Sequence, residues 1–130
     1  MPVEIKVPTQ NRCQMVEITR EVARAIRELK IEDGGVVVLV PHTTAGITIQ
    51  ENADPDVVRD MLMEIEKIVP FEDGYHHMEG NSAAHIKTTL FGNSVHLLVE
   101  NGEPLFGTWQ GVYLCEFDGP RTRKVWVKEV

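Results

Sequence analysis

The chain has 130 residues, of which 42% are hydrophobic and 25% are charged, and its net charge is −7. This length and composition are typical of one globular domain with its own hydrophobic core. The acidic balance argues against a nucleic-acid partner, because phosphate backbones select basic surfaces. The longest aliphatic run, residues 36–40, is too short to span a membrane, and the N-terminus does not have the pattern of a signal peptide. We therefore expect a cytoplasmic protein that binds neither nucleic acid nor membrane.

Four strands are predicted in the first half of the chain. Alternation of apolar and polar residues predicts strands over 3–7 and 46–50, and a weaker one over 13–17. Residues 36–40 are apolar without alternation, which predicts a central strand covered on both sides.

Three helices are predicted from their starts, stops and apolar stripes. The first begins at Thr19, which is a suitable N-cap. Asp54 and Pro55 form the strongest helix start in the chain, as N-cap and first helical residue. The third helix begins at Asn81 or Ser82, and its core face is expected to carry Ala83, Ile86 and Leu90.

The last third of the chain is predicted to be a β-meander. Strands are expected over 94–100, over 108–117 and over 123–130, and Asn101-Gly102 is a strong hairpin turn signal. No linker or repeat divides the chain. The sequence therefore predicts a single α+β domain over residues 1–130, rich in strands and with two or three helices.

The two cysteines, Cys13 and Cys115, have no CxxC spacing. We expect them to be reduced, buried thiols and neither a disulfide nor a zinc knuckle.

Three histidines are the first candidates for chemistry. His42 follows the predicted central strand, His77 lies in a loop, and His85 shares a helix face with Ser82, away from the apolar side. Three imidazoles and a water form the pattern of a catalytic zinc site. The spacing itself adds little support, because the chain has no HExxH or CxxC motif. A hydrogen-bonded strand-end histidine and solvated loop histidines explain the same residues without a metal, so the local sequence leaves both interpretations open.

Further candidates follow the strand over 46–50 and open the strand over 108–117. Glu51 and Asn52 have no local structural explanation and could serve in acid–base or polar positioning roles. Trp109 could stack on a flat heterocycle and Gln110 could bind its edge, or the pair could mark a bulge with a core tryptophan. Arg121 could clamp a phosphate through its planar fork, or could be a solvated turn residue.

Five motifs occur in the order that is typical of a known family. They are HTTA at 42–45, ENADP at 51–55, GN at 80–81 followed by AHIK at 84–87, GTWQG at 107–111 and DGPR at 118–121. Because these motifs extend over essentially the whole chain, the sequence resembles the YjbQ-like family. This family is often called the secondary thiamine-phosphate synthase enzyme family.

The resemblance implies a β-sandwich-like α+β subunit that assembles as a homotrimer, with a polar pocket near the subunit boundary. It implies a weak thiamine-phosphate synthase activity, in which a hydroxymethylpyrimidine pyrophosphate joins a thiazole phosphate and pyrophosphate is released. The expected metal ligands for a divalent ion, with zinc as the first choice, are His42, His77 and His85. The expected catalytic residues are His42, Glu51, Asn52 and His85. The expected residues for the phosphorylated small molecule are Thr43, Ser82, Lys87, Trp109, Gln110 and Arg121.

Two alternatives remain open. One is a protein that binds a small phosphorylated metabolite and catalyses a reaction only incidentally. The other is a metal-dependent hydrolase that activates water on histidine-bound metal.

Overall fold

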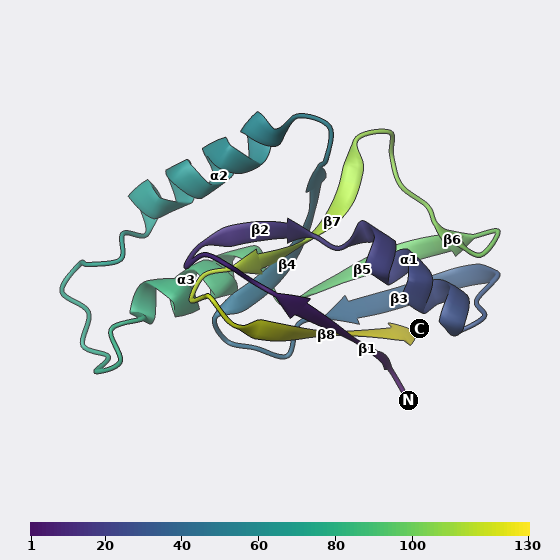
Figure 1. Ribbon diagram of the computed structural model, residues 1–130, viewed down its shortest axis with the longest axis horizontal. Coiled ribbons are helices and arrows are strands. Elements are labelled where there is room, and N and C mark those ends of the chain that lie inside the picture. Colours follow the sequence, from purple (N-terminus) through teal and green to yellow (C-terminus); the bar gives the residue numbers. More distant parts are fainter.

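The computed structural model describes all 130 residues, in eight strands and three helices (Figure 1). In chain order the elements are β1 (Val3–Pro8), β2 (Gln14–Glu17), α1 (Thr19–Glu28), β3 (Asp33–Leu39), β4 (Ala45–Glu51), α2 (Pro55–Ile68), α3 (Ser82–Phe91), β5 (Ser94–Glu100), β6 (Glu103–Pro104), β7 (Gln110–Glu116) and β8 (Thr122–Glu129). The predicted α+β class is confirmed, and the two-residue strand β6 is the only element that the sequence did not indicate.

Two antiparallel sheets form the framework. The larger has the order β1-β8-β3-β5-β6, and the smaller has the order β2-β7-β4. The chain ends lie close together in Figure 1, because β1 pairs antiparallel with β8 and Val3 lies opposite Val127. The inner faces of both sheets and helix α1 enclose the main hydrophobic core.

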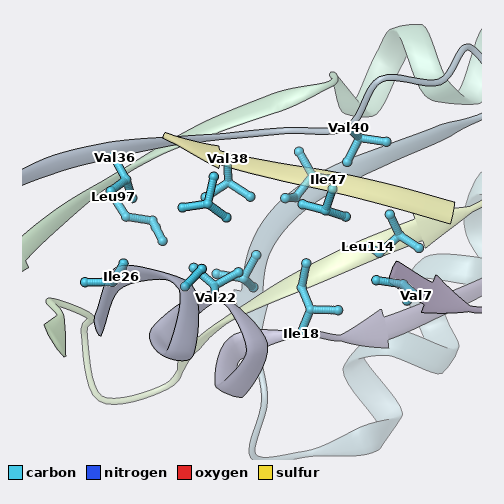
Figure 2. Close-up of a cluster of buried hydrophobic side chains, with 14 of the residues drawn as sticks. Val7, Ile18, Val22, Ile26, Val36, Val38, Val40, Ile47, Leu97 and Leu114 are labelled. Atoms are coloured by element: carbon cyan, nitrogen blue, oxygen red, sulfur yellow. The ribbon is translucent and has the colours of Figure 1, made fainter. Parts of the chain in front are cut away.

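The core consists mainly of β-branched and leucine side chains that point inward from each layer (Figure 2). Val22 and Ile26 of α1 pack with Val36 and Val38 of β3 and with Leu114 of β7, all fully buried. Each such side chain contributes about 1.5–3 kcal/mol when it leaves water. The polar side chains described below lie at the ends of these strands and in the loops that follow them.

The strand that is covered on both faces is β7, and the prediction for residues 36–40 was wrong in this respect. β3 is central as expected, between β8 and β5, but Val37 and Leu39 on its outer face remain partly exposed. The reason is that α1 and the smaller sheet cover only its inner face. Residues 112–117 are buried continuously, because the larger sheet lies on one side of β7 and helices α2 and α3 pack on the other.

Helix α3 buries a different face from the predicted one. Ala83 is buried as expected, but Ile86 and Leu90 are 39% and 60% exposed. The buried side chains are Ala83, Ala84, Lys87 and Thr88. The small alanines allow the helix to lie close to the smaller sheet, and this turns the larger apolar side chains outward.

The predicted caps and turns are mostly confirmed. Asp54 caps α2 by accepting a hydrogen bond from the backbone N–H of Asp56. The Asn101-Gly102 turn joins β5 to β6 with positive φ at both residues. Thr19, in contrast, lies inside the first turn of α1, and its hydroxyl accepts a hydrogen bond from the backbone N–H of Val112 instead.

Candidate functional site

A hollow of about 310 Å³ lies where the start of β4, the start of α3, the loop before α3 and the β7–β8 turn meet. None of its lining residues is hydrophobic. The lining residues are Thr43, Thr44, His77, Glu79, Asn81, His85, Asp118 and Arg121. We call this hollow the polar pocket. Charged and hydrogen-bonding side chains line it throughout, which suits a polar or charged ligand.

Two of the predicted histidines meet in the wall of this pocket. The rings of His77 and His85 pack edge to face, with centroids 5.6 Å apart. The same two residues also line a neighbouring hollow of about 640 Å³. The side chains that line this second hollow are Tyr75, His76, His77, Ser82, His85 and Ile86, together with Gly74. His77 and His85 therefore stand between two open spaces, and Ser82 lies in the larger one.

Arg121 is held at the pocket by Asp118. Its Nε donates to the backbone oxygen of Asp118 at 3.0 Å, and its Nη2 donates to the carboxylate at 3.2 Å. Asn81 Nδ2 donates to the same carboxylate oxygen at 2.8 Å, which ties the start of α3 to the turn. Nη1 of Arg121 has no hydrogen-bond acceptor in the chain and can bind a ligand oxygen. Because Glu79 and Asp118 carry two negative charges against one positive charge, the pocket needs a further cation before it favours a highly charged anion.

His42 lies beside the pocket and does not line it. Its Nε2 accepts a hydrogen bond from the backbone N–H of Lys124 at 2.9 Å, so the neutral ring carries its proton on Nδ1. Burial lowers the pKa of His42, and the nearby positive charge of Arg123 lowers it further. The structure thus brings together two of the three predicted metal ligands, His77 and His85, and engages the third in a backbone contact.

Lys87, predicted to bind substrate, points to the other side of α3. Its side chain is fully buried and its ammonium group donates to the carboxylate of Glu66, near the end of α2. The ammonium also lies 5.2 Å from the centre of the Phe71 ring, and Arg12 stacks on that ring at 3.4 Å. This cluster anchors the start of the loop that carries His77.

The remaining predicted residues gather at the far end of the smaller sheet. Glu51 pairs with Gln110 across β4 and β7, and the backbone N–H of Asn52 donates to the backbone oxygen of Trp109. The Trp109 side chain is 62% exposed. A strand as long as β4 places this group roughly 20 Å from Thr44. Within one chain, the predicted site residues therefore form two separate groups.

Four pocket residues were not predicted as site residues. Thr44, Glu79, Asn81 and Asp118 lie next to predicted residues in the sequence or in the family motifs. The spacing of Asp118 and Arg121 was the available signal, because an aspartate three residues before an arginine can hold the guanidinium across a turn.

The donor set of the pocket fits a divalent metal in part. Two imidazoles and the carboxylate of Glu79 are ligand types that zinc accepts. No three histidine, cysteine, aspartate or glutamate side chains converge on one point. His77 and His85 would hold such an ion, and a third ligand would come from a side-chain movement or from the bound ligand.

The fold and the pocket define a class: single-domain α+β proteins with two antiparallel sheets and a polar pocket at a strand end. The chain belongs to the YjbQ-like family, since the family model described as "UPF0047 protein YjbQ-like" matches residues 3–130. YugU of Bacillus subtilis is 51% identical over 95% of each chain, and MJ1081 of Methanocaldococcus jannaschii is 47% identical over 98% of this chain and 93% of its own.

Solved structures of relatives agree with this assignment. A YjbQ/UPF0047 protein of Clostridium acetobutylicum has a TM-score of 0.95 and 52% identity, over 98% of this chain and 99% of its own. The protein TT1486 of Thermus thermophilus has a TM-score of 0.92 and 44% identity, over 98% of this chain and 99% of its own. The names of these relatives specify the family and no reaction. No helix of the chain has the length and apolar character needed to cross a bilayer.

Proposed function

We propose that the protein is a transferase acting on phosphorylated heterocycles, with weak thiamine-phosphate synthase activity in the cytoplasm. The polar pocket is the single observation that carries this proposal, because it combines Arg121, two histidines and the hydroxyl groups of Thr43 and Thr44 with no hydrophobic side chain. In the reaction, the thiazole nitrogen forms a C–N bond to the pyrimidine methylene as the C–O bond to pyrophosphate breaks. The electron pair leaves with the pyrophosphate, whose growing charge must be stabilised.

Arg121 and Thr43 bind the leaving pyrophosphate in this proposal. Nη1 of Arg121 has no acceptor in the chain, and the exposed hydroxyl of Thr43 lies in the same lining. Without a metal ion, His85 donates a hydrogen bond to the leaving oxygen. A divalent ion on His77 and His85 would supply the additional positive charge that Glu79 and Asp118 make necessary.

The pyrimidine lies against Trp109 and Gln110 of a neighbouring subunit. The support is that Trp109 is 62% exposed and lies at the opposite end of β4 from the pocket. A homotrimer in which the two ends meet at the subunit boundary unites both groups of residues in one site. Glu51 and Asn52, beside Trp109, then position the heterocycle.

The test is turnover by the purified protein with hydroxymethylpyrimidine pyrophosphate, thiazole phosphate and added Zn²⁺ or Mg²⁺. We expect thiamine phosphate and pyrophosphate in equal amounts. Arg121→Lys keeps the charge but loses the planar fork, and we expect pyrophosphate affinity to fall about 10- to 100-fold. Arg27→Lys is the matched control, since Arg27 is 54% exposed in a surface pair with Glu103.

Two outcomes would favour other functions. Release of phosphate or pyrophosphate without thiazole phosphate would identify the metal-dependent hydrolase, which the adjacent His77 and His85 rings support. Tight pyrophosphate binding without any turnover would identify the metabolite-binding protein. Unchanged pyrophosphate affinity in Arg121→Lys would show that Arg121 is only a turn residue.

A further inference from the structure

A buried ion pair borders the polar pocket and has no part in the proposed reaction. Glu116 ends β7 and Arg123 lies near the start of β8, with side chains 0% and 2% exposed. Arg123 Nε donates to Glu116 Oε1 at 2.8 Å, and Nη2 donates to Oε2. The Thr9 hydroxyl donates to Oε1 at 2.8 Å, and the backbone N–H of Asp118 donates to Oε2 at 3.0 Å. Both oxygens of Glu116 are therefore fully engaged.

The pair contacts two different walls of the pocket. Arg123 Nη2 donates to the backbone oxygen of Thr44 at 3.1 Å and to its hydroxyl at 2.8 Å. Thr44 forms the wall at the start of β4. Glu116 holds another part of the pocket lining through the backbone of Asp118, whose side chain in turn holds Arg121. A single guanidinium–carboxylate unit thus sets the position of the threonine wall relative to the Asp118–Arg121 turn.

The turn is also packed directly against this pair. A Cβ atom at Gly119 would lie 2.9 Å from both Glu116 Cγ and Thr9 Oγ1, and 2.4 Å from the backbone oxygen of Asn11. No side chain can occupy this position without displacing the turn. The position of Arg121 is therefore coupled to that of Glu116 by contact as well as by hydrogen bonds.

Stability alone does not account for a charged pair at this place. Replacing a buried ion pair with apolar side chains of similar volume is often neutral or stabilising, because desolvation offsets the Coulomb attraction. A hydrophobic pair, however, could not bond to Thr44 and Asp118 at the same time. We propose that Glu116 and Arg123 are positioning residues, which hold the two walls of the polar pocket at the separation that its ligand requires and do not contact the ligand. The choice of pyrophosphate as ligand rests on the proposed function.

His42 provides a readout that needs no ligand. It immediately precedes the threonine wall, and its Nε2 accepts the backbone N–H of Lys124, the residue that follows Arg123. In the intact arrangement, neutral His42 is protonated on Nδ1. If the pair no longer holds the walls together, this bond is lost and the ring shifts toward the Nε2-protonated form. The ¹⁵N shifts of the imidazole at pH 8 distinguish the two tautomers.

The experiment compares the wild type with the double variant Glu116→Leu/Arg123→Met. We expect a thermal midpoint within a few degrees of wild type, a pyrophosphate dissociation constant raised at least tenfold in calorimetric titration, and loss of the Nδ1-protonated His42 signal. The control Arg27→Met/Glu103→Leu removes a surface pair and should keep both the wild-type affinity and the wild-type tautomer. Arg123→Lys is the second variant, to be used if the double variant does not fold. One ammonium cannot span Glu116 and Thr44 as the fork does, so the same changes are expected.

The outcomes separate this inference from the proposed function. A folded variant with wild-type His42 tautomer and wild-type affinity would show that the pair is merely structural and would overturn the inference. If the wild type itself does not bind pyrophosphate, the proposed function is wrong, and the His42 tautomer in the variants alone decides the positioning role.

Discussion

His77 and His85 are the residues on which the metal proposal now depends. They share one pocket wall, whereas His42 is bonded to the backbone of Lys124. We predict that His77→Ala and His85→Ala abolish Zn²⁺ retention after dialysis, measured by elemental analysis. His42→Ala and His96→Ala, the latter on the exposed side of β5, should retain the metal. Equal zinc content in all four variants would contradict a metal site on the two pocket histidines.

His42 also makes stability depend on pH. Burial, and then the charge of Arg123, lowers the pKa of His42 in the folded protein below the unfolded value of 6.5. The unfolded chain therefore binds more protons between these two pKa values, and stability falls as the pH drops below 6.5. Urea unfolding at pH 8, 6.5 and 5.5 should show this decline. His42→Gln, which can still accept the Lys124 bond, should show a smaller decline; an unchanged decline would assign it to other groups.

The Lys87–Glu66 ion pair joins α3 to α2, and removal of its two partners should destabilise the protein to different extents. Lys87 is fully buried, whereas its partner Glu66 is 47% exposed. Glu66→Leu leaves a buried ammonium without a counter-charge and should cost about 3 kcal/mol. Lys87→Met leaves a carboxylate that water can reach and should cost about 1–2 kcal/mol. Chemical denaturation measures both values.

The control for this comparison is another ion pair on α2. Arg59 and Asp56 form an exposed i,i+3 pair, so Arg59→Met should change stability by less than about 0.5 kcal/mol. If Glu66→Leu proves no more harmful than Lys87→Met, Lys87 is not held as a buried charge, and the anchor is hydrophobic packing against Phe71.

Two features of the whole molecule would be explained by assembly of several chains into an oligomer. The outer face of the larger sheet is uncovered, with Leu98 66% exposed, and Trp109 is exposed far from the polar pocket. We predict a homotrimer, so light scattering during gel filtration should give three times the 14.7 kDa mass of the chain. Dilution to micromolar concentration should not change that mass. A monomer under these conditions would remove the basis for a pocket shared between subunits.

Local signals predicted the helices and strands well. The Asp54 cap, the Asn101-Gly102 turn and the alternation in β1 all depend on neighbouring residues, so the sequence contains the whole cause. The wrong predictions concern burial, where an element distant in sequence decides which side chains are covered. The prediction that residues 36–40 are covered on both faces was wrong, because an apolar run cannot reveal which face another layer of the fold covers. α3 turned Ile86 outward because its alanines fit closely against the smaller sheet.

The candidate site likewise combines features that depend on neighbouring residues with features that depend on distant ones. Residue type and local spacing are enough to predict the α+β class, the element order and the family motifs. The sequence did not predict that His77 meets His85, that Lys87 pairs with Glu66 or that Trp109 lies far from Arg121. Distances between residues remote in sequence are set by strand pairing and layer packing, and these depend on the core as a whole.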